Sequence, residues 1–478
     1  MKNLRFVVLF LFISLLIIKQ SYADTIDLNT AIDKTIENSW SIKNSVLETQ
    51  IARDKLETAK DVYMPFFTSA IQHTYSETGA TVISQVPSTE TKQDEWNNSI
   101  SKMFENGFSG SIGVNLTKTD TSVPSLGNLD DNRENLIFSL SYPLMKNRSG
   151  RSLKNPIEIA EFNENISRLQ YEHLIEGQIL STIISFYQVC LLLEDKKTVM
   201  ANLEGAESVV KTMKHKYEIG TSEEKDYLRS QASVSAQNTR LIAVNNLLAK
   251  SKINLLRVMG EKDISRDFDI SYNLTTSLTP IENKREVVLE SYPQRKDIKQ
   301  LQHQIEISKK NITIEEDKNT PNLDISTSYA TDGLGGNNTF AESETPGWLI
   351  GLTFKKTFGG KSRISESIKQ KEKLENILED FKDTIEEEVL LAIEDVNFLL
   401  KSLNEAEKLK NIQTKRLSEE EKDFNLGRTS VRDIEEARND LTSAQLVLAQ
   451  AKINVIRAYA KLLFVNGELN ENFHMRLR

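Results

Sequence analysis

Acidic residues follow two glycine-containing breaks in a sequence that is otherwise strongly helical. Asp226 ends the break YEIGTSEEKD, and Asp433 ends the break FNLGRTSVRD about 207 residues later. Glu436 lies three residues beyond Asp433, so the two carboxylates share one face of a helix. Asp433 also stands three residues after Ser430, where an acid caps a helix start and complements its dipole.

Catalytic chemistry is not visible in the sequence. The five histidines are scattered and form no pair with metal-ligand spacing: His73, His173, His215, His303 and His474. The chain contains no G-x-S-x-G, P-loop or H-E-x-x-H motif. The glycines of 333–336 follow a strand but open no helix, which is typical of a turn rather than a phosphate site. We therefore expect no enzyme activity, no cofactor and no metal site.

Composition and the chain start indicate an exported protein. Lys2 and Arg5 precede an apolar run, Phe6 to Ile18, and a small-x-small site at 21–23, so residues 1–23 are predicted to be a signal peptide. No later stretch is apolar enough to span a membrane as a helix. A net charge of −9 excludes nucleic acid as an expected partner. The single Cys190 lies in an apolar run and is expected in the core.

The chain is an internal duplication. Ile42 and Pro65 have the same separation as Ile298 and Pro321, and Gly220 and Gly260 have the same separation as Gly427 and Gly467. The first repeat is expected at 24–260, a linker at 261–284 and the second repeat at 285–478. Each repeat is predicted to contain a helix, a β region, a long helix, a tip and a further helix.

The β regions differ in length between the repeats. They are expected at 66–143 and 322–358, where apolar and polar residues alternate as in strands with two different faces. The first is 46 residues longer, measured from Pro65 to Gly150 and from Pro321 to Gly360. It is predicted to hold a large loop or an additional hairpin, since Trp96 to Phe104 is strand-like.

Long helices follow both β regions, from about 151 to 216 and from about 361 to 423, and they need helical neighbours along their whole length. The tips at 217–226 and 424–433 are predicted to be tight turns, because Gly220 and Gly427 allow a left-handed backbone. Thr221 and Ser430 can each cap the helix that follows.

The chain resembles the TolC-like outer-membrane efflux protein family over essentially the whole mature sequence. The resemblance rests on LNTAIDKTIENSWSIKNS, on a proline that ends a helix before two strands, on FGGKSR after the second strand pair, and on the duplicated tips. It implies a mainly α fold with a transmembrane β part. A homotrimer would share a twelve-stranded β-barrel, with four strands from each copy, continued by a long periplasmic α-helical coiled-coil barrel.

The resemblance also implies a location and a function. The chain would lie in the outer membrane of a Gram-negative cell, with its helical part in the periplasm and its strands against outer-membrane lipid. It would be the passive exit duct of a tripartite efflux or type I secretion system, served by a periplasmic adaptor protein and an inner-membrane pump or ABC transporter. The alternative is a periplasmic or secreted coiled-coil scaffold without channel activity.

The resemblance assigns roles to the two tips. Adaptor docking would fall on Ile219, Gly220, Thr221, Leu426, Gly427 and Arg428. A periplasmic gate would be formed by Asp433, Glu436, Asp226 and Phe424, with a ring of carboxylates that attracts cations and raises its own pKa values by mutual repulsion. Capping alone and pore lining combined with capping are both consistent with Asp433.

Three positions depart from the family's gate. Thr429 stands where the family has an arginine. Arg229 occupies the position of the first repeat that corresponds to Glu436 in the second. Phe424 replaces a tyrosine that could hydrogen-bond to Asp226. We therefore expect the links between copies that hold the gate shut to be weaker or rearranged.

Overall fold

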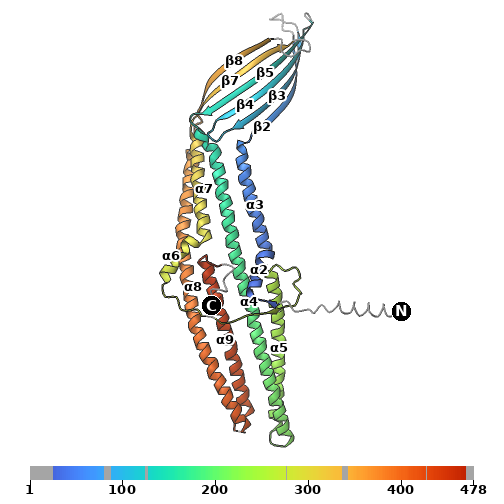
Figure 1. The fold of residues 1–478 in the computed structure, drawn as a ribbon, viewed down its shortest axis with the longest axis vertical. Helices are drawn as coiled ribbons and strands as arrows, with labels where there is room; N and C mark the ends of the chain where they lie inside the picture. The colour runs from blue at the N-terminus through green and yellow to red at the C-terminus, as the bar shows by residue number, and fades with distance from the viewer. Residues whose placement is uncertain are drawn as a thin grey trace, which may run out of the picture. The chain divides into compact units, whose positions relative to one another are not determined.

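The computed structural model describes residues 25–79, 88–123, 127–275, 277–335, 343–426 and 428–469 (Figure 1). These residues form two compact units. The helical unit contains the residues up to 47, 169–298 and those from 380 onward, and the sheet unit contains 48–168 and 299–379. The predicted signal peptide, residues 1–23, lies outside the described residues.

The elements follow one order in both halves of the chain: two helices, strands, a long helix and a shorter helix. The first half has α2 (Leu28–Asn38), α3 (Trp40–Lys60), α4 (Arg151–Glu218) and α5 (Glu224–Val258). The second half has α6 (Lys284–Gln294), α7 (Lys296–Asn319), α8 (Lys361–Asn425) and α9 (Val431–Val465). The short strands β1 (Thr25–Ile26) and β6 (Asp269–Ile270) pair in parallel within the helical unit. The chain thus has two internal repeats.

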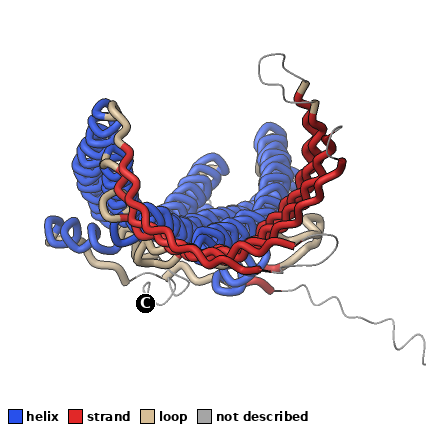
Figure 2. Tube along the Cα trace, turned by 90° about the horizontal axis from the view of Figure 1, so that it is seen from above, coloured by secondary structure: helices blue, strands red, loops and turns tan. Residues whose placement is uncertain are grey.

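The sheet unit is built on one antiparallel sheet of six strands. Its strands, in the order in which they pair, are β2 (Phe66–Thr78), β3 (Thr89–Met103), β4 (Ser109–Val123), β5 (Gly127–Pro143), β7 (Asn322–Gly335) and β8 (Ser343–Lys355). β2 and β8 are the two edges and do not pair with each other. Figure 2 shows that the sheet is strongly curved and open.

The expectation of four strands from each chain is therefore wrong, and the described part of the sheet contains six. The longer first β region forms two hairpins, β2–β3 and β4–β5, where the second repeat forms only β7–β8. The additional length is an extra hairpin rather than a large loop, because the polar residues before Trp96 continue β3. Asp94, for example, lies opposite His73 of β2 and Lys118 of β4.

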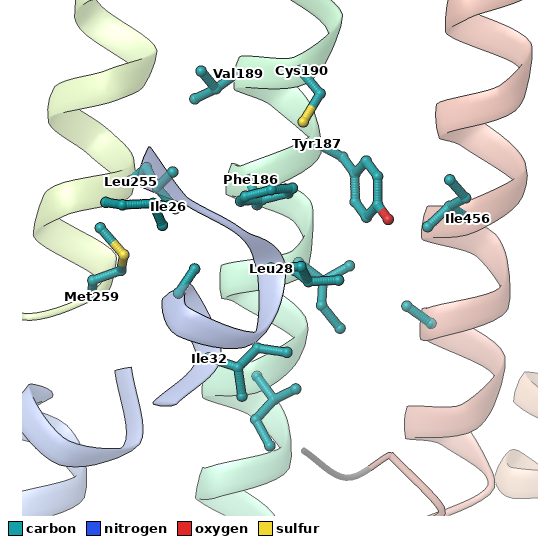
Figure 3. Packing of buried hydrophobic residues seen from close by; sticks show 14 of the residues in the cluster. Ile26, Leu28, Ile32, Phe186, Tyr187, Val189, Cys190, Leu255, Met259 and Ile456 are labelled. Atoms are coloured by element: carbon teal, nitrogen blue, oxygen red, sulfur yellow. The ribbon is translucent and has the colours of Figure 1, made fainter. Parts of the chain in front are cut away.

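The helical unit has a continuous apolar core. Figure 3 shows Phe186, Tyr187 and Cys190 of α4 facing residues of α2, α5 and α9, among them Ile32, Leu255 and Ile456. Cys190 is fully buried in this cluster, as its apolar sequence context predicted. The core therefore joins α2 to α4 and α5 of the first repeat and to α9 of the second.

One correction concerns α4. Its sequence contains a stretch that is long and apolar enough to cross a membrane, contrary to the sequence-based expectation, and half of that stretch is buried inside the structure. Ile179, Ile183 and Phe186 of this helix belong to the core of the helical unit. A buried core helix explains this composition.

The glycine that follows the last helix of each repeat, Gly260 or Gly467, allows two helix ends to approach closely. Gly260 follows α5 with φ 70°, and a Cβ atom there would lie 2.6 Å from the carbonyl carbon of Asn38 at the end of α2. Gly467 follows α9 with φ 71°, and its Cβ atom would lie 3.0 Å from the carbonyl oxygen of Gln294 at the end of α6. The equal spacing of these glycines in the sequence thus reflects one packing contact made twice.

Candidate functional site

One face of the sheet carries an apolar row across all six strands. Register places these residues side by side, in strand order: Phe67, Ile100, Ile112, Phe138, Tyr329 and Trp348. The rings of Tyr329 and Trp348 are 4.8 Å apart between centroids. Trp348 remains 76% exposed in the single chain. An apolar surface of this extent needs a covering phase or partner, because soluble proteins rarely expose one.

The opposite face is mainly polar on the four inner strands, β3, β4, β5 and β7. Side chains alternate between the two faces of a strand, so the residues next to the apolar row point the other way. One row contains Ser101, Ser111, Ser139 and Ser328 on the four inner strands and ends in Phe66 and Leu349 on the edge strands. Another contains Asn97, Asn115, Asn135 and Asp332. A sheet with one apolar and one polar face can separate lipid from water.

The first tip ends α4 with the turn that its glycine predicted. Gly220 has φ 78°, and the amide of Thr221 donates to the carbonyl oxygen of Lys216 at 2.8 Å. This is the bond pattern that closes a helix on a left-handed glycine. The prediction that Thr221 caps the next helix is wrong, since its hydroxyl also donates to Lys216 O and the residue before α5 is Glu223.

The second tip has the predicted cap. Ser430 precedes α9, and a capping box links its side chain and amide to Asp433. One carboxylate oxygen of Asp433 accepts from the Ser430 hydroxyl at 2.5 Å, from the Ser430 amide at 3.1 Å and from the Thr429 hydroxyl at 3.2 Å. The hydrogen bonds from Ser430 lower the pKa of Asp433 in the single chain. Gly427 lies outside the described residues.

Phe424 lies in an apolar cluster between the two tips. Its ring is buried against Val209 and Met213 of α4 and against Ile434 of α9. The ammonium of Lys216 lies 4.9 Å from the centroid of that ring. Phe424 therefore ties the first tip to the second inside one chain, a contact that the sequence did not reveal.

Of the two remaining candidate gate residues, Glu436 and Asp226, the first lies in an ion pair. Glu436 lies 3.6 Å from Arg416 of α8, between the nearest nitrogen and oxygen atoms, and the same arginine contacts Asp440 at 2.5 Å. Arg229 lies 3.8 Å from Glu435, the neighbour of Glu436. Asp226 lies in the first turn of α5 and is half-buried. The sequence predicted the acids of this region but not their basic partners from other helices.

The candidate docking residues form an exposed surface at the tips. Ile219 and Leu426 are 58% and 64% exposed, which is unusual for large apolar side chains. Arg428 is exposed as well and lies 4.0 Å from Asp423. Among the described residues, no group of three or more His, Cys, Asp or Glu could hold a metal ion.

Comparison with known proteins agrees with this geometry. Residues 107–261 match the family model of outer membrane efflux proteins. No curated protein sequence matches the chain.

Several solved structures resemble the chain at low sequence identity. The CmeC outer membrane channel of Campylobacter jejuni has 14% identity and a TM-score of 0.66, covering 94% of this chain and 88% of that one. The outer membrane protein VceC of Vibrio cholerae has 14% identity and a TM-score of 0.67, covering 92% and 96%. The MtrE outer membrane channel of Neisseria gonorrhoeae, solved in an open state, has 14% identity and a TM-score of 0.62, covering 93% and 90%. Residues 107–261 thus match the outer membrane efflux protein family, and the chain as a whole shares the fold of these outer-membrane channels.

Proposed function

We propose that this protein is the outer-membrane exit duct of a tripartite efflux or type I secretion system. The observation that carries the proposal is the sheet, which has an apolar row on one face and polar rows on the other. In an outer membrane the apolar face would contact lipid and the polar face would line a water-filled lumen. The family match and the shared fold support the same assignment.

The open edges of the sheet require further copies of the chain. Unpaired backbone groups in lipid cost several kcal/mol each, so β2 and β8 need partners in a membrane. Six strands alternate in direction, so β8 of one copy runs antiparallel to β2 of the next. Three copies, the number that the family resemblance implies, would close a barrel of eighteen strands rather than twelve.

The tips would serve the partners of the duct. A periplasmic adaptor protein would dock on the exposed apolar side chains of Ile219 and Leu426 and on Arg428, and an inner-membrane pump or ABC transporter would supply the energy. The carboxylates of Asp433, Glu436 and Asp226 from each copy would line the periplasmic gate. Phe424 would set the position of the second tip from its buried site rather than face the pore.

The test is membrane insertion followed by electrical recording. The mature protein is expected in the outer-membrane fraction as an oligomer that migrates differently after heating, and it is expected to carry ion current in planar bilayers. A coiled-coil scaffold would instead stay in the aqueous fraction after membranes are pelleted. A monomer that neither enters bilayers nor conducts would overturn the proposed channel.

A further inference from the structure

A pocket lies on the polar face of the sheet unit, where the strands meet the following helices. Its volume is about 460 Å³. Its lining includes Lys146, Lys318 and Lys355, the hydroxyl residues Ser141 and Thr357, and one acid, Asp324. Pockets of a few hundred Å³ are large enough for small organic molecules.

The register of the strands fixes the face on which this pocket opens. Ser141 lies opposite Ser109 and Ser326, and Asn322 lies opposite Lys355. These positions alternate with those of the apolar row and so belong to the polar face. In the proposed channel the pocket would therefore face the lumen and not the lipid.

Two of the three lysines in the pocket form no ion pair with any residue that the structure describes. Lys318 pairs with Glu315 at 2.7 Å, whereas the ammonium groups of Lys146 and Lys355 have no hydrogen-bond or ion-pair partner among the residues that the structure describes. The carboxylate of Asp324 accepts a hydrogen bond from the side chain of Asn322. Two lysines without an ion-pair partner, Lys146 and Lys355, thus line the pocket together with one acid, Asp324.

The sequence around these lysines adds further positive charge. Residues 135–157 contain four basic residues and no acidic one. Residues 345–365 also contain four basic residues and no acidic one. These basic residues are Lys146, Arg148, Arg151 and Lys154 in the first segment, and Lys355, Lys356, Lys361 and Arg363 in the second. Both segments connect a strand to a long helix, so these two connections carry a local excess of positive charge.

The wall of the pocket is held by buried contacts. Asp317 is buried, and its carboxylate accepts from the Asn147 amide at 3.0 Å and from the Ser152 hydroxyl at 2.6 Å. A Cβ atom at Gly150 would lie 2.1 Å from the carbonyl oxygen of Glu105, so two connections of the sheet touch here. These contacts fix the backbone on either side of Lys146 before any ligand binds.

We propose that this pocket binds the phosphate group of an anionic solute that passes through the duct. A phosphate monoester carries a charge of about −1.5 to −2 at neutral pH, opposite in sign to the lysines that outnumber the one acid of the lining, and lysine is a common phosphate ligand. The volume leaves room for a small organic group beside the phosphate. The inference rests on the proposed channel for its biological meaning, since the polar face becomes a lumen only in that assembly.

The test measures binding and conduction on the same variants of the full-length mature protein. Inorganic phosphate and a small phosphate monoester are titrated into the detergent-purified oligomer by calorimetry at low ionic strength. The double variant Lys146→Gln/Lys355→Gln is expected to bind both probes at least roughly tenfold more weakly, since hydrogen bonds to charged groups contribute that much or more. The variant Lys146→Arg/Lys355→Arg is expected to retain binding, because it keeps the charge.

Lys102→Gln is the matched control. Lys102 lies at the same end of the sheet, opposite Gly110, but on the apolar face, and its ammonium lies 5.3 Å from the centroid of the Phe104 ring. It is expected to leave phosphate binding unchanged. If both variants form normal oligomers, equal phosphate affinity in Lys146→Gln/Lys355→Gln and Lys102→Gln would show that phosphate does not bind in this pocket.

Bilayer recording separates this inference from the proposed function. Phosphate on one side is expected to reduce the chloride current of the wild-type channel, and the reduction is expected to disappear in Lys146→Gln/Lys355→Gln. Current that phosphate never affects would exclude the luminal site but leave the channel intact. Absence of current in every variant would instead exclude the channel.

Discussion

At the residue scale, Asp433 combines helix capping with the charge of the second tip. Its folded pKa lies below the usual carboxyl value of 3.8, because hydrogen bonds from Ser430 favour the ionised form. The stabilisation by the cap is therefore fully present above that value and is lost as the pH falls through the lower folded pKa. Hydrogen exchange in the first turn of α9 is expected to accelerate as the pH falls through this window.

The control for this pH dependence is Asp433→Asn. Its exchange, corrected for the intrinsic rate, is expected to show no such step, because the side chain no longer titrates. A step of equal size in both proteins would assign the titration to another group near the tip.

The two interpretations of Asp433 are separable by conduction. Asp433→Ala/Glu436→Ala is expected to weaken the block of single-channel current by divalent cations, because it removes two of the three carboxylates that each copy would contribute to the gate. Ser430→Ala is the matched control, since it removes the capping hydroxyl and leaves both acids in place. Ser430→Ala is expected to destabilise α9 by about 1 kcal/mol and to preserve the block.

Two outcomes of this comparison would count against the carboxylate gate. Unchanged divalent block in Asp433→Ala/Glu436→Ala would leave capping as the whole role of Asp433. Equal loss of block in Ser430→Ala would show that the shape of the tip, rather than its charge, controls the current. Glu436→Gln, which leaves the capping box intact, is expected to give a partial effect.

At the element scale, the close approach of helix ends depends on the glycine that follows the last helix of each repeat, Gly260 or Gly467. Gly260→Ala is expected to destabilise the helical unit by about 2–5 kcal/mol, since it adds a left-handed penalty to a collision with the backbone of Asn38. Gly220→Ala has the same kind of backbone penalty but no neighbour within 4 Å, so about 1–2 kcal/mol is expected. Urea unfolding followed by circular dichroism ranks the variants.

Gly177 supplies the third member of this series. It lies inside α4 with no atom within 4 Å of an added Cβ, so Gly177→Ala is expected to be neutral or to stabilise by up to about 1 kcal/mol. If Gly260→Ala were no more destabilising than Gly220→Ala, the close contact with α2 would not contribute to the free energy of unfolding.

The elements that the sequence predicted well are those with local causes. Gly220 has the left-handed turn, Ser430 has the cap, and both long helices begin at or close to the expected residue, because glycine geometry, capping and helical periodicity act within a few residues. The extra hairpin was one of two alternatives. Its polar strand β3 has little apolar alternation, and only pairing with β2 and β4 shows that it is a strand.

Long-range pairings were not predictable from one sequence. Arg416 contacts Glu436 and Asp440 because α8 and α9 pack face to face, and helix periodicity does not fix that rotation. Arg295 illustrates the same limit, since it contacts Asp297, Glu388 and the Val465 carbonyl oxygen from three helices. The burial of Phe424 likewise depends on α4 and α9 meeting beside it.

At the scale of the whole molecule, the unpaired edges of the sheet determine what assembly is possible. Both edge strands expose large apolar residues, including Ile71 of β2 and Ile350 of β8, which are 72% and 78% exposed. An edge of this kind pairs readily with another chain. Because β2 and β8 are different surfaces, their pairing is head-to-tail and gives either a closed ring or an open filament.

Disulfide crosslinking distinguishes these assemblies. Ala70 of β2 is changed to cysteine together with one of three β8 residues on the same face, Leu349, Gly351 or Thr353, in a Cys190→Ala background. One of these registers is expected to bring the two Cα atoms of neighbouring copies within about 4.4–6.8 Å, the range in which a disulfide forms.

Each chain then has one bond on each edge, so a closed ring of three gives a covalent trimer that oxidation does not extend. The single variant Ala70→Cys is expected to remain uncrosslinked, because β2 meets β8 and never another β2. A ladder of species beyond the trimer would indicate an open filament, and monomer alone at every register would exclude pairing between β2 and β8.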